Sequence, residues 1–251
     1  MPGKLDIPIV STQKRIPFSV WGPLALIGLT IGGYFIFVNN FLRYWRPENW
    51  GTVEEGAVYR SDRIMPHLVV DRLQEFGIDV LVNLESRDPG DESQLATIAA
   101  CEKLGIELKR FGMRGNGIPS EPLPECVRKY ARALAAIAEA RAQEKVVLIQ
   151  CAAGRHRTGG MTDTYRMLIA GDPPHDAYDE LKAYGWKPRK HQLLADWLNA
   201  NMASIAQELV DMGVLDAVPD PLPYLGPEGV EPIRRDPLDV QKEIIAEAMA
   251  D

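Results

Sequence analysis

Short apolar runs alternate with helical patterns through the middle of the chain. Runs typical of strands lie at Val80–Leu84, Ile106–Phe111 and Val146–Gln150. Apolar residues recur at the spacing of one helix face at His67–Phe76, Gln94–Leu104 and Pro124–Ala142. Because the strands are separated by helices, we predict an α/β fold with a central, mainly parallel sheet flanked by helices.

The pattern after the last strand is helical only. It predicts helices at Thr158–Ile169, His175–Tyr184 and His191–Met212, with a break at residues 171–174. Prolines are frequent from Val218 to Pro237, which predicts an extended strap or a flexible linker. A short terminal helix is then expected to start at Pro237 and end near Ala250.

The longest apolar stretch lies near the N-terminus. No charged residue occurs between Arg15 and Arg43, and Phe18 to Val38 is predominantly apolar, which is long enough to span a bilayer. A cleaved signal peptide is the alternative, but residues 37–41 lack a small-x-small cleavage pattern. We therefore predict an uncleaved, single-pass transmembrane helix.

These patterns divide the chain into four parts. They are an N-terminal tail at 1–17, the membrane anchor at 18–42, a compact domain at 47–212, and the strap with its short C-terminal helix at 213–251. Basic residues flank the apolar stretch on both sides, so they do not fix the orientation of the anchor.

The predicted strand ending at Gln150 leads directly into Cys151, and Arg157 follows six residues later. Small residues and a glycine between them allow a tight turn into a helix that we expect to start near Thr158. Backbone N–H groups of residues 152–157 can then converge on a tetrahedral oxyanion at a helix N-terminus. The same field favours the thiolate form of Cys151, which is the nucleophilic form.

This loop predicts phosphoryl transfer without a metal or an organic cofactor. Cys151 would attack phosphorus to give a phosphocysteine that water later hydrolyses. Arg157 would hold two equatorial oxygens with its planar fork, and Thr158 could donate its hydroxyl to the sulfur. The residues expected to bind substrate are Ala152, Ala153, Gly154, Arg155 and His156. The alternative, that Cys151 is an ordinary core cysteine, gives no reason for Arg157.

Three further segments carry a family likeness, at Asn49–Ser61, Phe76–Leu84 and Phe111–Asn116. With the Cys151 loop, they resemble the cysteine-dependent phosphatases, and within them the atypical dual-specificity phosphatases of plants and fungi that act on inositol pyrophosphates. The likeness runs from about Asn49 to Asn199. It implies a dual-specificity phosphatase-like fold and hydrolysis of phosphoesters or phosphoanhydrides.

The loop also departs from the family pattern. Gln150 stands where the family usually has histidine, and Ala152 and Ala153 replace basic residues that follow the nucleophile. Arg155 and His156 keep the next part of the loop basic.

A second basic group follows at Lys187, Arg189 and Lys190, near the start of a predicted helix. It is either part of an anion site or a solvated helix end.

A general acid is not obvious, because no Asp occurs between Asp91 and Asp163. The matching loop offers Glu121 and Glu125, and Glu121 is the candidate acid. Both also suit the first turn of a helix. A tyrosinate leaving group has a conjugate-acid pKa of about 10, whereas phosphate has a second pKa of about 6, so tyrosinate needs a proton from the enzyme far more than phosphate does. The lack of an obvious general acid therefore favours phosphoanhydride substrates.

The formal net charge of −7 argues against a nucleic-acid partner. Three cysteines do not make a disulfide framework, and a thiolate nucleophile works only when reduced, so we expect a cytoplasmic catalytic domain.

The leading hypothesis is a membrane-anchored phosphatase whose substrate is an inositol pyrophosphate, a phosphoprotein or a phospholipid. The alternatives are a phosphatidyl-lipid phosphatase, a tyrosine or dual-specificity protein phosphatase, and a pseudophosphatase that binds phosphate without turnover. Sulfur transfer fits the spacing and the Arg-Thr-Gly ending less well.

Overall fold

The computed structural model describes residues 18–37, 47, 49–114, 116–118, 121–230 and 232–250. The chain forms two compact units, residues 1–45 and 46–251. The first contains helix α1, Phe18–Ile36. Within the described residues, no helix is both long enough and apolar enough to cross a membrane, so the predicted transmembrane helix is not confirmed. Residues 38–42 of that prediction and the 1–17 tail lie outside the described residues.

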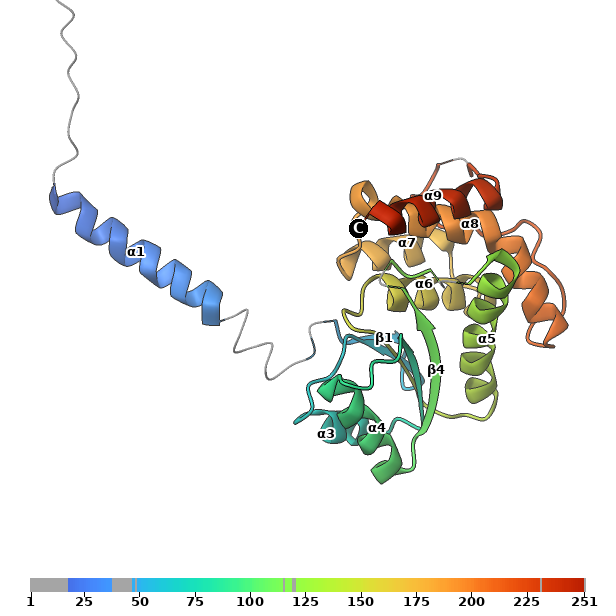
Figure 1. Ribbon diagram of the computed structural model, residues 1–251, viewed down its shortest axis with the longest axis horizontal. Coiled ribbons are helices and arrows are strands. Elements are labelled where there is room, and N and C mark those ends of the chain that lie inside the picture. Colours follow the sequence, from blue (N-terminus) through green and yellow to red (C-terminus); the bar gives the residue numbers. More distant parts are fainter. Residues whose placement is uncertain are drawn as a thin grey trace, which may run out of the picture. The chain divides into compact units, whose positions relative to one another are not determined.

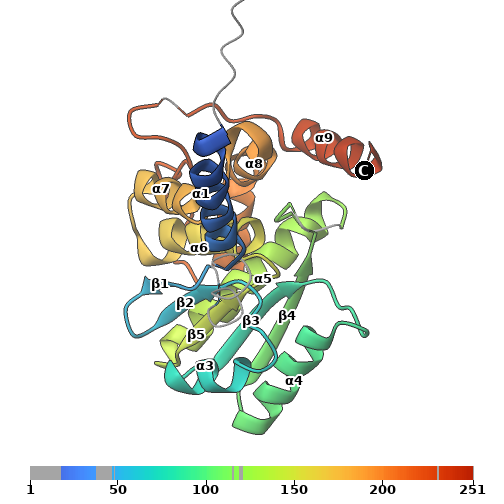
Figure 2. The same ribbon diagram turned by 90° about the vertical axis from the view of Figure 1, so that its left-hand side faces the viewer.

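The second unit is built on a five-stranded sheet with the strand order β1-β2-β5-β3-β4 (Figures 1 and 2). The strands are β1 Gly51–Glu54, β2 Val58–Ser61, β3 Val80–Glu85, β4 Glu107–Met113 and β5 Val147–Gln150. Only the β1–β2 pairing is antiparallel, and β2–β5, β5–β3 and β3–β4 are parallel. The predicted mainly parallel sheet is therefore confirmed.

Helices cover both faces of this sheet (Figure 2). They are α3 Val69–Glu75, α4 Glu92–Leu104, α5 Leu123–Ala142, α6 His156–Tyr165, α7 Pro174–Ala183, α8 Pro188–Asp211 and α9 Pro237–Ala250, with a π-helical turn at Arg166–Ala170. One core lies against α3 and α4, and the larger core lies against the later helices.

The strand sequences explain this layering. Val147 and Ile149 of β5 enter the larger core, while Leu148 between them enters the smaller one. Successive side chains of a strand point to opposite faces, so a strand covered on both faces needs a continuous apolar run. β5 is thus held firmly on both sides, directly before Cys151.

Most helix starts differ from the sequence prediction by one to three residues, and two of these differences lie near Cys151 or the basic residues after it. α6 begins at His156 instead of Thr158, and it passes into the π-helical turn at Arg166. α8 begins at Pro188 instead of His191, and His191 has a non-helical φ of −134° at a kink. The first turn of α8 is polar and contains no apolar repeat, so periodicity could not reveal it, whereas proline suits this position.

The proline-rich strap is held against the helices. Asn199 of α8 donates to the carbonyl of Leu225 at 3.0 Å and accepts from its N–H at 2.8 Å. Arg234 donates to the carbonyls of Leu222 and Pro223 at 3.0 and 3.1 Å.

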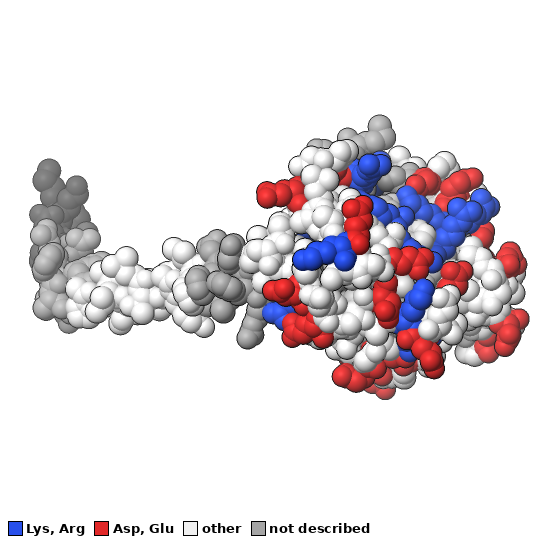
Figure 3. Space-filling view, turned by 90° about the horizontal axis from the view of Figure 1, so that it is seen from below, with Lys and Arg blue, Asp and Glu red and all other residues white. Residues whose placement is uncertain are grey.

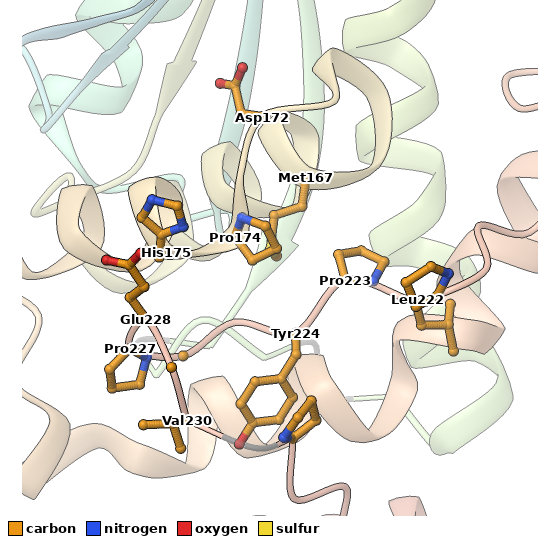
Figure 4. A pocket seen from close by; sticks show the side chains of 14 residues that line it. Met167, Asp172, Pro174, His175, Leu222, Pro223, Tyr224, Pro227, Glu228 and Val230 are labelled. Carbon is orange, nitrogen blue, oxygen red and sulfur yellow. The ribbon is translucent and has the colours of Figure 1, made fainter.

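The strap lines a cavity of about 490 Å³. Figure 4 shows Tyr224 and the strap prolines on one side of this cavity and Met167 and His175 on the other. The cavity contains no residue of the Cys151 loop.

Candidate active site

Cys151 follows β5 directly and is 1% exposed. The N–H of Gly154 donates to the Cys151 Sγ at 3.2 Å. Residues 151–155 turn between the strand and α6, whose first residue is His156. The sulfur thus receives a backbone N–H in the turn that precedes a helix, which is the arrangement that stabilises a thiolate.

Gly154 makes this turn possible. Its φ is +61°, and a Cβ at this position would come within 2.6 Å of the Asp62 backbone nitrogen. A side chain at residue 154 would therefore require the loop or the segment after β2 to move. Ala152 is half-buried and Ala153 is exposed.

Arg157 and Thr158 lie in the first turn of α6. The half-buried Arg157 side chain places Nη1 at 3.4 Å from the carbonyl of Met113, at the end of β4. The Thr158 hydroxyl is buried and makes no hydrogen bond to any described residue, so the predicted bond to the sulfur is not formed here.

Gln150, the residue before the nucleophile, is fully buried at the end of β5. Its Nε2 donates to the carbonyl of Asp62 at 3.2 Å. Its side chain therefore ties β5 to the segment that follows β2.

The comparisons with known proteins point to one fold. No family model matches the chain, and no curated protein matches it. The Siw14 catalytic core is 20% identical with a TM-score of 0.50, over 71% of this chain and 96% of that chain. The core catalytic domain of the PP-IP phosphatase SIW14 from S. cerevisiae, in complex with citrate, is 21% identical over 71% and 98%, also with a TM-score of 0.50. P. aeruginosa TpbA in complex with pTyr is 16% identical over 67% of this chain and 98% of that chain, with a TM-score of 0.48.

The chain has the fold of the cysteine-dependent phosphatases. The fold implied by the family resemblance is therefore confirmed.

In this phosphatase fold, the basic residues of the loop meet the start of α8. The His156 and His191 rings lie 4.2 Å apart between centroids. A Cβ at Gly185, shortly before α8, would come within 3.3 Å of Arg155 Nε. The exposed side chains of Arg189 and Lys190 line a cavity of about 160 Å³ together with His191. Arg189 and Lys190 of the second predicted group therefore lie next to the His156–His191 contact, whereas Lys187 does not line this cavity. We call Arg155, His156, Arg189, Lys190 and His191 the basic rim.

The structure places Glu121, the predicted general acid, beside a lysine of α5. Its Oε1 accepts from Lys129 Nζ at 2.6 Å. It lines a cavity of about 390 Å³ beside α5 and β4, which contains no residue of the Cys151 loop. Figure 3 shows Lys and Arg side chains next to Asp and Glu side chains on the visible face of the 46–251 unit. The acid role of Glu121 stays a prediction.

The other two cysteines are core residues. Burial raises the pKa of Cys101 to about 11 and that of Cys126 to about 12. Both thiols are therefore protonated near neutral pH and belong to the hydrophobic cores.

Arg60 is a site residue that sequence reasoning did not select. It is fully buried in β2, and its Nη2 donates to the carbonyl of Gly154 at 2.9 Å. Its Nη1 donates to Glu180 Oε1 at 2.8 Å, and its guanidinium lies 3.7 Å from the centre of the Tyr184 ring. The sequence feature that could have revealed Arg60 is a charged residue within a short, otherwise uncharged strand segment. Such a buried charge requires partners, which makes the residue a candidate for a structural role.

Asp163 lies in α6 behind the loop and is fully buried. Burial raises its pKa well above the usual range, and the charge of Arg60 acts in the opposite direction. Asp163 therefore keeps its proton in the folded chain over a pH range in which the unfolded chain ionises. Folding takes up a proton there, so its contribution to stability falls as the pH rises above about 4.

We expect Asp163→Asn to raise the free energy of unfolding at pH 7 by roughly 1–3 kcal/mol, with the gain vanishing near pH 4. Denaturant unfolding at both pH values measures this, and Asp216→Asn, at an exposed position, serves as the control. An equal effect at both pH values would contradict the assignment.

Proposed function

We propose that this chain is a cysteine-dependent phosphatase that hydrolyses phosphoesters or phosphoanhydrides through a phosphocysteine intermediate. The observation that carries the proposal is the hydrogen bond from the Gly154 N–H to the Cys151 sulfur, in a loop that opens a helix carrying Arg157. A core cysteine needs neither the donor nor the arginine.

The proposed reaction has two displacements. The Cys151 thiolate attacks phosphorus, an S–P bond forms, and the P–O bond to the leaving group breaks with its electron pair on that oxygen. Water then attacks phosphorus, loses a proton, and the S–P bond breaks to give inorganic phosphate and the thiolate. Loop N–H groups and Arg157 offset the charge on the equatorial oxygens in both steps.

The basic rim supports a multiply charged small-molecule substrate. On a chain of net charge −7, Arg189 and Lys190 stand exposed beside the loop, at the His156–His191 contact. A phosphoanhydride releases a phosphate group whose second pKa is about 6, so its departure depends little on a general acid. We therefore propose inositol pyrophosphates as the preferred class.

The test compares phosphate release by the full chain from an inositol pyrophosphate, a phosphotyrosine peptide and a phosphatidylinositol phosphate. We expect the double variant Arg189→Gln, Lys190→Gln to raise KM for the pyrophosphate about tenfold and to leave KM for the peptide unchanged, because Arg189 and Lys190 would bind the additional phosphate groups of the pyrophosphate, which the peptide lacks. Lys242→Gln is the control, since this exposed lysine lies on α9.

Each outcome of this panel separates the alternatives. Faster turnover of phosphotyrosine would overturn the anhydride preference, and faster turnover of the lipid would favour the phosphatidyl-lipid phosphatase. Phosphate binding without turnover would favour the pseudophosphatase. Glu121→Gln belongs in the same panel, because an acid role requires a larger loss on phosphotyrosine than on the pyrophosphate.

Membrane attachment through the N-terminal helix, with the catalytic domain in the cytoplasm, is also part of the proposal. It rests on the charge-free stretch between Arg15 and Arg43 and on exposed apolar side chains of α1, such as Leu29. Membrane fractionation of the full chain against a chain starting at Pro47 tests it, and equal partitioning of the two would reject it.

A further inference from the structure

The carbonyl groups of three successive residues in the Cys151 loop are all held by donors from outside the loop. The Arg63 backbone N–H donates to the Ala152 carbonyl at 3.4 Å, and Asn49 Nδ2 donates to the Ala153 carbonyl at 2.7 Å. Arg60 Nη2 donates to the Gly154 carbonyl at 2.9 Å. The first is long for a hydrogen bond, and the other two are of ordinary length. The two side-chain donors, Asn49 and Arg60, are therefore the stronger holds on the loop.

A trans peptide fixes the N–H of one residue opposite the carbonyl of the residue before it. The peptide between residues 153 and 154 has both ends engaged. Its carbonyl accepts from Asn49, and its N–H donates to the Cys151 sulfur at 3.2 Å. Reversing this peptide would turn a carbonyl oxygen toward the thiolate and remove its donor.

Arg60 acts in the same way on the next peptide. By holding the Gly154 carbonyl, it directs the N–H of residue 155 to the opposite side. The guanidinium is itself fixed by Glu180, by the Thr162 hydroxyl at 3.3 Å and by the face of the Tyr184 ring. Arg166 pairs with the same Glu180 and with Asp172, so the negative charge of Glu180 is shared by two arginines.

Close packing holds the loop against these donors. A Cβ at Gly154 would lie 2.8 Å from the Asn49 Cβ and 2.9 Å from the Ser61 carbonyl carbon. These distances are shorter than van der Waals contact, so the glycine allows the loop to approach the segment that carries Asn49.

We propose that Asn49 and Arg60 are positioning residues that set the orientation of the loop N–H groups toward Cys151 and a bound oxyanion. The inference rests on the proposed function, because it assigns these residues to the phosphate-binding loop. Neither residue contacts the sulfur. Each acts through a carbonyl on the outer side of the loop.

The experiment measures the rate at which iodoacetamide alkylates Cys151 in the full chain as a function of pH, with and without inorganic phosphate. We expect Asn49→Ala and the isosteric Asn49→Asp, which cannot donate from its carboxylate, to move the midpoint of the alkylation profile to higher pH. We also expect protection by phosphate to weaken about tenfold and kcat to fall about 10²-fold, the usual loss for one oxyanion donor. All three cysteines are buried, so alkylation of Cys151 is followed by mass spectrometry of the peptide that contains it. Burial raises the pKa of Cys101 to about 11 and that of Cys126 to about 12, so these two thiols stay protonated over the neutral part of the profile.

Arg60→Lys is the second variant. Lysine keeps the positive charge beside Glu180 but lacks the planar guanidinium, which donates to Glu180 and to the Gly154 carbonyl at the same time. This variant should shift the alkylation profile in the same direction. Two matched controls remove similar contacts outside the loop. Asn201→Ala loses a bond from Nδ2 to the carbonyl of Trp197 at 2.8 Å, and Arg141→Lys alters a guanidinium that binds Glu54 and a backbone carbonyl.

The controls should lower the unfolding temperature without moving the alkylation profile. If the Asn49 variants fold and keep both the wild-type profile and the wild-type protection by phosphate, the positioning role is wrong. Alkylation does not require turnover. A chain without phosphatase activity whose profile still shifts would therefore reject the proposed function and keep this inference.

Discussion

Replacing Cys151 with serine is expected to lower phosphate release by about 10⁴-fold or more, because removal of a nucleophile costs an enzyme factors of this size. A serine hydroxyl is protonated at neutral pH and is a much weaker nucleophile than a thiolate. The Gly154 N–H donates to the sulfur, which favours a charged atom at this position. Serine is nearly isosteric with cysteine, so it should fit the buried position and leave the loop intact.

Steady-state phosphate release on the three substrates measures this loss, and isothermal titration with inorganic phosphate measures whether the loop still binds. Cys126→Ser is the matched control, since Cys126 is equally buried but lies on α5. It should lower stability and leave kcat unchanged. Residual turnover above about a tenth of wild type in Cys151→Ser would show that the sulfur is not the nucleophile.

The sequence was sufficient to predict the backbone around Cys151, because its parts are contiguous in the chain. β5, the turn and the first helical turn follow one another within residues 147–158, so the apolar run, the small residues and the Cys-to-Arg spacing all describe one piece of backbone. The parallel sheet could also be predicted, because strands that are buried on both faces are continuous apolar runs that the sequence shows directly.

The outer supports of the loop could not be predicted in this way. Asn49 lies 104 positions before Ala153, and Arg60 lies 120 positions before Glu180. Such pairs become visible only when the strand order is known, because β2 must lie beside β5 for Arg60 to reach the Gly154 carbonyl. The charge within Val58–Ser61 could have indicated that Arg60 has a partner, but not which partner.

The basic rim shows the intermediate case. The sequence contained both basic groups, but their meeting depends on the kink at His191 and on the turn at Gly185, where φ is +89°. Glu121 is a case that the structure does not decide. Its position in the matching loop suggested an acid, and the structure pairs it with Lys129 of α5.

Arg157→Lys is expected to lower kcat by about 10²–10³-fold while retaining most of the ability to bind inorganic phosphate. Lysine keeps the positive charge, which attracts the ground-state anion. It cannot donate two parallel hydrogen bonds to two equatorial oxygens, and these bonds gain strength as those oxygens spread into the plane of the transition state. The loss should therefore fall on kcat more than on KM.

The resting position of Arg157 supports this expectation. Its contact with the Met113 carbonyl, 3.4 Å from Nη1, is too long to be a strong bond, so little is lost when the guanidinium turns to a bound phosphate. Arg128→Lys is the matched control, because Arg128 is a surface residue of α5 that lies 3.6 Å from Glu208. If Arg157→Lys raised KM and left kcat unchanged, the arginine would act in ground-state binding only, because a group that stabilises substrate and transition state equally cannot accelerate the chemical step.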